Sequence, residues 1–290
     1  MSEGPGIFVQ RWMRIRIQAA AMKIPLLALT LVATPALAQS PLSALVAEYE
    51  TGPAAIFQND GRYGPTGTDY EASDLNQKSN LYRTQRIALE ARLGERHGLI
   101  LLWAPFDITT RATLSRDLDF RGTVFPAGSV VDSRYLFEGY RGSYLYRLIH
   151  RERFSWDIGA SVQIRNALVD LSAVDGSRYA KESDIGVVGA LKTRLRYELP
   201  SRVWAGLEAD ALSTFGLLGN TTGGIYDVAL TLGVPLSSKG DVSAYARLRL
   251  LGGGADVKRR DIYNWGNFGF ALVGVQADLV SLVERGTSKP

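Results

Sequence analysis

Histidine is the side chain best suited to proton transfer near neutral pH, and this chain has only two, His97 and His150. Both stand in short polar stretches, 95–98 and 150–153. A serine hydrolase needs its serine, histidine and carboxylate at one place. Asp107 is expected toward the far end of the strand that begins near His97. We find no hydrolase signature and assign no catalytic residue.

A second set of residues that could have a function is charged. These residues recur in the middle of segments in which polar and apolar residues alternate. If these residues face a narrow interior, ion pairs such as Arg194 or Arg196 with Glu208 or Asp210 would fill it. An incompletely paired set would instead leave a basic wall that attracts a small anion. The set holds ten basic and five acidic residues: Arg86, Glu90, Arg92, Arg141, Arg147, Asp157, Arg165, Lys192, Arg194, Arg196, Glu198, Glu208, Asp210, Arg247 and Arg249.

The segments that carry these charges alternate in hydrophobicity with a period of two, as a strand with two different faces does. In 154–165 the apolar residues from Phe154 to Ile164 share one face, and the polar residues from Ser155 to Arg165 share the other. The same pattern occurs in 185–199 and 241–250. We predict ten strands, at about 43–58, 79–95, 98–112, 131–149, 153–171, 184–199, 202–214, 223–235, 240–252 and 266–280.

The predicted connections are alternately short and long. Short ones lie at 95–98, 150–153, 200–201 and 237–240, and long ones at about 59–78, 113–130, 172–183, 215–222 and 253–265. Short turns at one end, long loops at the other and an even strand number are typical of a transmembrane antiparallel up-and-down β-barrel. Eight or twelve strands are the alternative counts. Gly252, Gly253 and Gly254 are expected at a strand-to-loop corner.

A soluble all-β barrel or sandwich is the main alternative fold, since alternation does not tell which face is outside. The strands are long enough to span a membrane, which takes about 9 to 11 tilted residues. Aromatic residues near strand ends are typical of interfacial girdles. The aromatic residues expected there are Trp103, Phe106, Tyr135, Tyr144, Tyr146, Phe154, Trp156, Tyr197, Trp265, Phe268 and Phe270.

Residues 1–38 are expected to be a leader with a signal peptide, and residues 39–290 a single barrel domain. Basic residues precede an apolar run at 24–33, and Ala36-Leu37-Ala38 forms a cleavage site, which is the order of a secretory signal peptide. Translation starts at Met1 or at Met22. The leader holds four of the 33 basic residues and one of the 29 acidic ones, so the remainder is nearly neutral. The region after the leader therefore lacks the excess of basic charge that nucleic-acid binding needs.

The chain has no cysteine, which excludes disulfides and thiolate sites. Nor does it show a dinucleotide fingerprint or a metal-ligand spacing, so no cofactor is predicted.

Several segments together resemble a family of uncharacterised proteobacterial outer-membrane β-barrel proteins. The resemblance covers most of the region after the leader. It is carried by 93–97 (LGERH), 101–105 (LLWAP), 120–128 (FRGTVFPAG), 141–147 (RGSYLYR) and 252–256 (GGGAD) with 263–264 (YN). It implies a barrel in the outer membrane of a Gram-negative bacterium, with no reaction attached. Such barrels usually end on an aromatic residue, whereas 281–290 follow the last predicted strand here.

These patterns predict a non-enzymatic outer-membrane barrel with periplasmic termini. Two forms remain open: a narrow anion-preferring channel, or a structural or surface-binding barrel plugged by ion pairs. The alternative is an outer-membrane enzyme acting on lipid or peptide. The expected partners are outer-membrane lipids, the export and barrel-assembly machineries and, for the channel, a small anion.

Overall fold

The alternating segments form long strands, and the computed structural model describes residues 42–215, 217 and 219–287 of the chain. The predicted leader lies outside the described residues. Ten strands build a barrel: β1 (Leu42–Tyr63), β2 (Leu81–Leu93), β3 (His97–Thr113), β6 (Val130–His150), β7 (Phe154–Ala173), β8 (Tyr179–Glu198), β9 (Trp204–Ser213), β10 (Thr221–Pro235), β11 (Val242–Val257) and β12 (Ile262–Asp278). The other elements are the hairpin β4 (Leu118–Phe120) and β5 (Thr123–Phe125), the 3-10 turn η1 (Lys258–Arg260) and the helix α1 (Leu279–Thr287).

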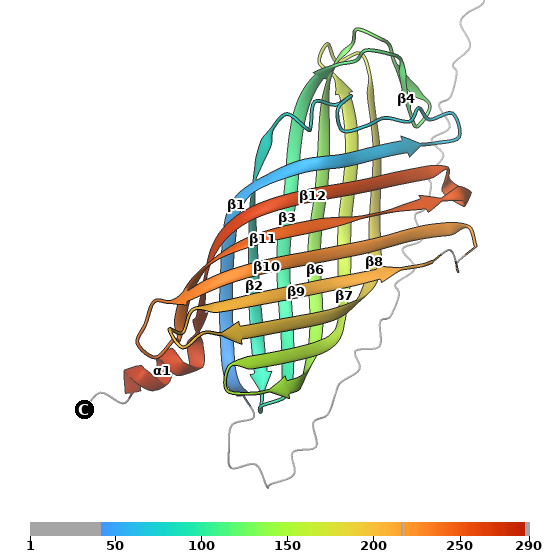
Figure 1. Cartoon of the computed structure of the whole chain (residues 1–290). Coiled ribbons are helices and arrows are strands. Elements are labelled where there is room, and N and C mark those ends of the chain that lie inside the picture. Colours follow the sequence, from blue (N-terminus) through green and yellow to red (C-terminus); the bar gives the residue numbers. More distant parts are fainter. Residues whose placement is uncertain (1–41, 216, 218, 288–290) are drawn as a thin grey trace, which may run out of the picture. The chain divides into compact units, whose positions relative to one another are not determined.

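Each barrel strand pairs antiparallel with its neighbours along the chain, and β1 pairs with β12 to close the barrel (Figure 1). The predicted antiparallel up-and-down barrel of ten strands is confirmed. The short connections and the helix α1 lie at one end, called here the short-turn end (Figure 1). The opposite end is called the long-loop end.

None of the described helices is both long and apolar enough to span a membrane.

Several strands extend farther toward the long-loop end than the alternation indicates. The first strand continues to Tyr63, and β11 continues to Val257. The prediction of a strand-to-loop corner at Gly252, Gly253 and Gly254 is therefore wrong, because all three lie within β11. A Cβ atom on Gly254 would lie 2.1 Å from the carbonyl oxygen of Asn264 in β12, so the absence of a side chain permits close strand approach.

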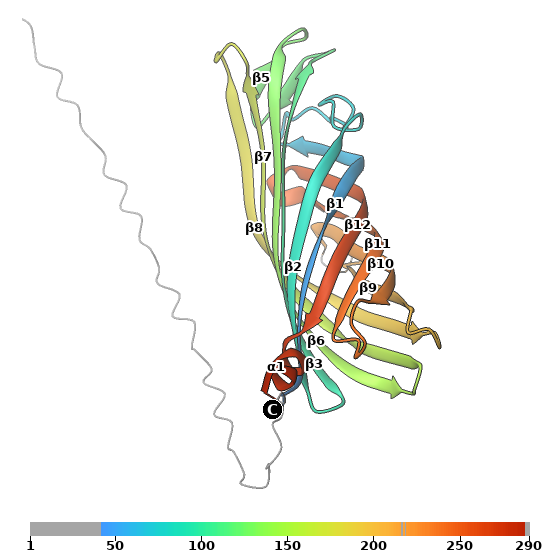
Figure 2. The ribbon, with the colours of Figure 1, turned by 90° about the vertical axis from the view of Figure 1, so that its left-hand side faces the viewer.

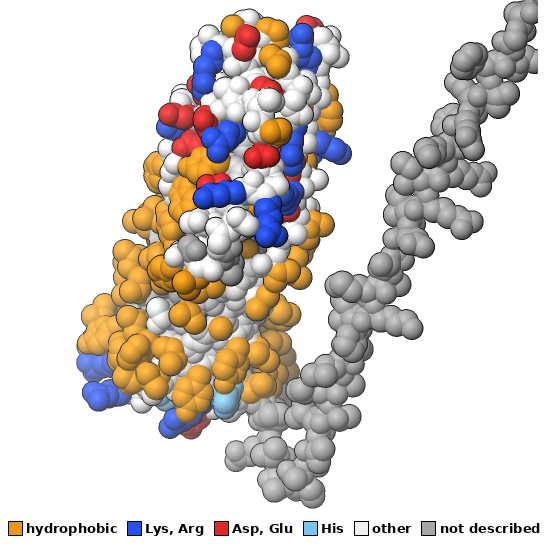
Figure 3. Space-filling model, turned by 90° about the vertical axis from the view of Figure 1, so that its right-hand side faces the viewer, with side chains coloured by type: hydrophobic (Ala, Val, Ile, Leu, Met, Phe, Trp, Pro, Cys, Tyr) orange, Lys and Arg blue, Asp and Glu red, His pale blue; other side chains and the backbone are white. Residues whose placement is uncertain are grey.

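Apolar side chains cover the outer surface in a broad belt nearer the short-turn end. Figure 3 shows them gathered over the lower half of one face, with charged side chains over the upper half. The exposed apolar residues of the belt include Leu101, Tyr144, Val162, Ile185, Val187, Leu191, Leu230, Leu232, Leu248, Leu250, Val273 and Val275. Above the belt, ion pairs of 2.7 Å join Asp107 to Arg134 and Arg111 to Asp132 on the outer surface of β3 and β6.

The barrel divides into two sheets toward the long-loop end (Figure 2). Strands β8 and β9 are paired only from Leu191–Ala211 to Glu198–Trp204, although β8 begins at Tyr179. Strands β2 and β3 are likewise paired only from Ile87–Trp103 to Leu93–His97, at the short-turn end. One sheet thus continues as β3, β6, β7 and β8, and the other as β9 to β12 with β1 and β2. Two seams separate the sheets.

Long loops fold over the long-loop end and bury an apolar cluster there, called here the cap. The hairpin β4–β5 contributes Phe120 and Phe125, which are 1% and 0% exposed. They pack with Tyr63 from β1, Leu75 from the first long loop and Leu171 from β7, among others. The cap therefore joins both sheets across the long-loop end.

Candidate functional site

The lumen side of the strands carries the charged residues that the sequence singles out. Side chains alternate between the two faces of a strand, and the charged residues lie on the same face as the buried ones. Examples of buried residues on this face are Asp157 and Gln163 in β7 and Lys192 in β8. The structure brings most of them into two groups, one nearer the short-turn end and one in the middle of the lumen.

Asp157 is the centre of the group nearer the short turns. Its carboxylate is 1% exposed and accepts hydrogen bonds from Arg92, Arg147 and Arg194 at 2.8, 3.1 and 3.0 Å. Arg194 also binds Glu90 with two hydrogen bonds, of 2.6 and 2.8 Å. Glu90 is on β2 and Arg194 on β8, so this pair crosses the lumen. Paired guanidinium and carboxylate groups of this kind are among the strongest side-chain contacts.

The middle group forms a wall across the lumen, called here the septum. It consists of Glu50, Arg86, Arg141, Gln163, Lys192, Asp210, Asp227 and Arg249. Arg141 lies on β6 and reaches Asp210 and Asp227 on β9 and β10 at 3.1 and 2.9 Å. It also donates to Gln163 at 2.9 and 2.7 Å. The wall is therefore held from both sheets.

Other ion pairs tie the septum to the first strand. Glu50 is 1% exposed and pairs with Arg247, Arg86 and Arg249 at 2.5, 3.3 and 3.4 Å. Glu48 pairs with Arg247 at 2.9 Å. Glu48, Glu50 and Asp227 are lumen acids that the sequence reasoning missed. With them, the excess of basic side chains is much smaller than predicted.

Two of the predicted partners differ from those in the structure. Arg194 lies opposite Glu208 in the strand register, yet its guanidinium pairs with Glu90 and Asp157. Lys192 takes the neighbouring acids instead, at 2.9 Å from Glu208 and 2.8 Å from Asp210. The long arginine side chain can cross a narrow lumen to a carboxylate that it binds twice, which explains the difference.

Arg196 and Glu198 stand apart from both groups. The Arg196 guanidinium lies 4.1 Å from the ring centre of Trp204, a cation–π contact. Both residues line the vestibule, a cavity of about 570 Å³ on the short-turn side of the septum.

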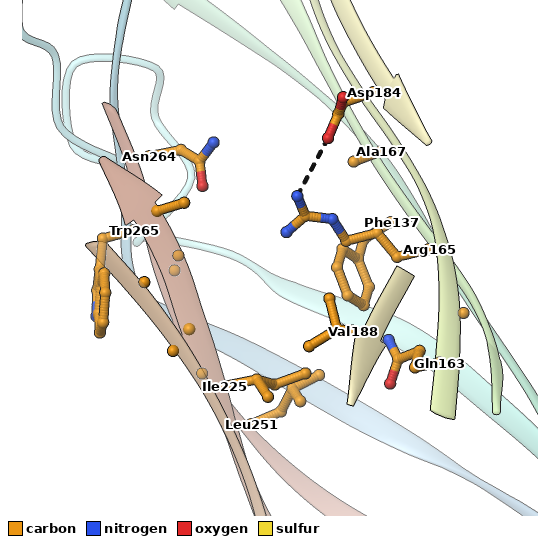
Figure 4. Close-up of a pocket in the computed structure, with 18 of the residues that line it drawn as sticks. Phe137, Gln163, Arg165, Ala167, Asp184, Val188, Ile225, Leu251, Asn264 and Trp265 are labelled. Atoms are coloured by element: carbon orange, nitrogen blue, oxygen red, sulfur yellow. Dashed lines mark hydrogen bonds and ion pairs between the residues drawn. The ribbon is translucent and has the colours of Figure 1, made fainter. Parts of the chain in front are cut away.

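A second cavity, of about 650 Å³, lies between the septum and the cap and is mostly apolar (Figure 4). Aromatic side chains from both sheets meet in it: Phe106 and Phe268 have ring centres 5.7 Å apart, and Tyr135 stacks on Phe268 at 5.8 Å. Phe137, Val188, Ile225 and Leu251 add to its apolar lining, and Arg165 and Asp184 are among the polar residues that Figure 4 labels beside them. Arg86, Arg141 and Arg249 of the septum line both cavities, so the septum separates them.

The prediction that Phe106, Tyr135, Phe268 and Phe270 belong to an interfacial girdle is wrong. Phe106 and Phe268 are buried, and all four line the apolar cavity. They lie near strand ends, as a girdle residue would, but on the inward-facing positions of β3, β6 and β12. The signal available in the sequence was alternation: Tyr135 has the parity of Arg141 and Arg147, which the sequence analysis places in the lumen.

One seam of the barrel is covered. Between β2 and β3, the first long loop lays buried Leu75 and Gln77 against the strands. Thr110 donates a hydrogen bond of 2.7 Å to the Leu75 carbonyl, and Asn59 donates one of 2.9 Å to Gln77. This loop closes the seam.

The other seam, between β8 and β9, has a gap beside the cavity, called here the window. It lies between 185–190 of β8 and 212–214, and both stretches contribute to the cavity lining. Below, the window ends at the Leu191–Ala211 pair. Above, Arg260 of η1 pairs with Glu182 and Asp184 at 2.9 Å each. The hydrogen bond to Asp184 raises the pKa of the Arg260 guanidinium.

No protein-family profile matches the chain, and neither does any curated protein. The chain is similar to solved structures of other barrels. One is Ail, the attachment invasion locus protein of Yersinia pestis, in complex with the heparin analogue sucrose octasulfate, with 10% identity, a TM-score of 0.36, and coverage of 81% of this chain and 99% of that one. A FadL homologue of Pseudomonas aeruginosa has 9% identity and a TM-score of 0.36, over 81% and 90% of the two chains. The toluene transporter TodX of Pseudomonas putida has 7% identity and a TM-score of 0.36, over 82% and 90%. With scores this low, nothing about activity or ligand follows from the likeness.

Neither histidine belongs to the group around Asp157 or to the septum. His97 contacts the Tyr144 hydroxyl at 2.8 Å on the outer surface at the short-turn end, and His150 lies at the mouth of the vestibule. Asp107 is at the opposite end of β3 and is paired with Arg134. Within the described residues, no group of three or more histidine and carboxylate side chains is placed to hold a metal ion.

Proposed function

We propose that the chain is a non-enzymatic β-barrel of the bacterial outer membrane whose lumen is closed to ions by paired side chains. The observation that carries the proposal is the septum, in which buried arginines and carboxylates from both sheets neutralise one another. The form proposed is thus the plugged barrel rather than the anion-preferring channel.

The outer surface supports placement in a membrane. A soluble barrel of this size would lose free energy by exposing a belt of leucine, valine and isoleucine, because water is a poor solvent for them. A bilayer accepts the same belt without that loss. Toward the short-turn end each barrel strand is paired with both neighbours, so no strand edge is left unpaired in lipid there. Outer-membrane lipids are then the belt's partners, and the export and barrel-assembly machineries would deliver the chain there.

The septum supports closure. A channel that prefers anions needs basic groups that are free to exchange a carboxylate for a passing anion. Arg141 instead binds two carboxylates and an amide, and it is 7% exposed. Anion passage would have to break these contacts in a region of low dielectric constant, where they are strong.

Anion flux into vesicles tests this proposal. The protein is refolded into phospholipid vesicles that contain a dye quenched by chloride, and chloride is then added outside. Quenching no faster than in protein-free vesicles is expected, while vesicles with a general porin serve as the positive control. Rapid quenching that slows when Arg194 and Arg196 are both changed to glutamine would show an arginine-lined pore and overturn the proposal.

A further inference from the structure

We propose that the apolar cavity binds a single acyl chain, which enters from the membrane through the window between β8 and β9, and that Arg165 holds the ligand's anionic head. This inference rests on the membrane placement proposed above. It assigns a ligand class to the cavity and a route by which the ligand reaches it.

The lining of the cavity is the first argument. Interiors of membrane barrels are usually polar, because the lumen contains water or paired charges. Here the interior changes from charged at the septum to aromatic and aliphatic at Phe106, Phe137, Ile225 and Leu251. A volume of about 650 Å³ lies within the range of small-molecule sites, about 300–1,000 Å³. The apolar part of this space suits a hydrocarbon chain.

The routes into the cavity are the second argument. The cap covers the long-loop end, and the septum blocks the way from the vestibule. The first long loop closes the β2–β3 seam through the contacts of Thr110 and Asn59. Among the described residues, no backbone pairing or side-chain hydrogen bond joins the two edges of the window, where only the Leu212 side chain approaches Gly189. An acyl chain could displace this one flexible side chain.

The surroundings of the window are the third argument. Ile185 and Val187 on β8 are 76% and 71% exposed, and Leu217 beside β9 is 84% exposed. These side chains continue the apolar belt up to the cavity mouth. An acyl chain could therefore pass from the bilayer into the cavity without entering water.

Arg165 is the fourth argument. Its side chain projects into the cavity beside Asp184 (Figure 4), and Asp184 also pairs with Arg260. A single contact of 3.3 Å joins it to Asp184, and its buried Nε has no hydrogen-bond partner among the described residues. A guanidinium has five donors. The Nε packs against Gly186, so the donors on the terminal nitrogens are the ones placed to bind a carboxylate or phosphate at the upper end of a chain in the cavity.

Photolabelling tests the proposal. The protein is refolded into phospholipid vesicles with a diazirine at the end of an acyl chain, in two arms. One arm carries the diazirine on a free fatty acid, and the other on the chain of a phospholipid. Labelled peptides are then mapped by mass spectrometry. Labelling of β6 and β12 at Tyr135, Phe137 or Phe268 is expected, and the arm in which it occurs tells whether the ligand is a free acid or a membrane lipid.

A cross-link across the window tests the route. The cysteine-free chain permits the pair Ala190→Cys and Leu212→Cys, the next positions in register above Leu191–Ala211. Joining them with a reducible bifunctional thiosulfonate is expected to abolish cavity labelling, and reduction to restore it. The matched control joins Thr193→Cys to Ala209→Cys, which are already paired between the same strands. Cavity labelling that persists with the window cross-linked would overturn the route.

Arg165→Gln tests the head group. Loss of a charge-assisted hydrogen bond is expected to weaken cavity labelling by the fatty acid about tenfold, with no change for the corresponding fatty alcohol. Equal effects on the acid and the alcohol would contradict a role for Arg165 in binding charge.

Labelling of the outer belt separates the two proposals. Belt residues are labelled in every arm if the barrel spans the bilayer, so their absence would contradict the membrane placement. Belt labelling without cavity labelling in either arm would overturn the acyl-chain site alone.

Discussion

Asp157 shows how the lumen tolerates so many arginines. Its buried carboxylate accepts from three of them, and Glu90 accepts from Arg194 and pairs with Arg92 at 2.5 Å. A buried charge is costly unless it is paired and hydrogen-bonded, and each acid here serves several bases. The carboxylates in the lumen therefore hold the arginine side chains in place, and the arginines in turn hold the carboxylates.

Asp157→Asn is expected to destabilise the barrel by about 3 kcal/mol, because it leaves Arg147 without a charged partner in the lumen. Arg92 and Arg194 keep Glu90, which limits the loss. The measurement is the urea concentration at the midpoint of unfolding from vesicles. Glu198→Gln is the control, since that carboxylate makes no ion pair with a described residue, and its midpoint is expected to stay near that of the wild type. Equal shifts for both variants would contradict the role given to Asp157.

At the scale of the strand, alternation was enough to predict the number, order and face of most elements. The segments 154–165 and 185–199 alternate strongly, so their inward residues follow directly. The first strand does not, because its outward face includes Ala47, Thr51 and Pro53. Without a strongly apolar face there was no sign that Glu48 and Glu50 point inward.

The cavity was beyond the reach of that reasoning for a different reason. Alternation separates two faces of a strand but does not say how the interior changes along the barrel axis. Whether Phe106 meets Phe268 depends on the pairing of strands distant in sequence, on their tilt, and on where the two sheets separate. The hairpin β4–β5 and the cap depend equally on contacts between loops.

The first long loop gives an element-scale prediction, since a single buried hydrogen bond joins Thr110 to the loop at Leu75. Thr110→Val removes this hydrogen bond and is expected to lower the free energy of opening the loop by about 1 kcal/mol. Trypsin should then cleave after Lys78 roughly fivefold faster, because the open loop is more populated. Thr109→Val, on the exposed outer face of the same strand, is the control. A loop that is equally resistant in both variants would show that other contacts hold the seam closed.

At the scale of the whole molecule, the outer surface divides into an apolar belt and a charged region, and this division predicts the depth of insertion. Leu248→Arg, in the belt on β11, is expected to lower stability in vesicles by about 2–4 kcal/mol. Thr109→Arg, beside the Asp107–Arg134 pair above the belt, is expected to change it by less than about 1 kcal/mol. Urea titration of refolded protein measures both, and equal losses would contradict the assigned belt.

The lumen also has a consistent order along the axis: vestibule, septum, apolar cavity and cap. The septum is central, because it separates a water-accessible compartment from an apolar one. Its closure depends on side chains rather than on backbone.

Labelling of a cysteine in the apolar cavity by a charged, water-soluble maleimide tests this closure most directly, because the cap would hinder ions from crossing the barrel even without the septum. Ile225→Cys, in the cavity lining, is introduced into the wild type, into a septum variant with Arg141, Asp210, Asp227 and Arg249 all changed to serine, and into an outer-surface control with Asp107, Arg111, Asp132 and Arg134 changed to serine. Each set of four changes removes two positive and two negative charges. With the reagent on both sides of vesicles that hold the refolded barrel, the cysteine is expected to react slowly in the wild type and the control, and quickly in the septum variant. Fast labelling in the wild type, or slow labelling in a folded septum variant, would contradict a lumen closed by ion pairs.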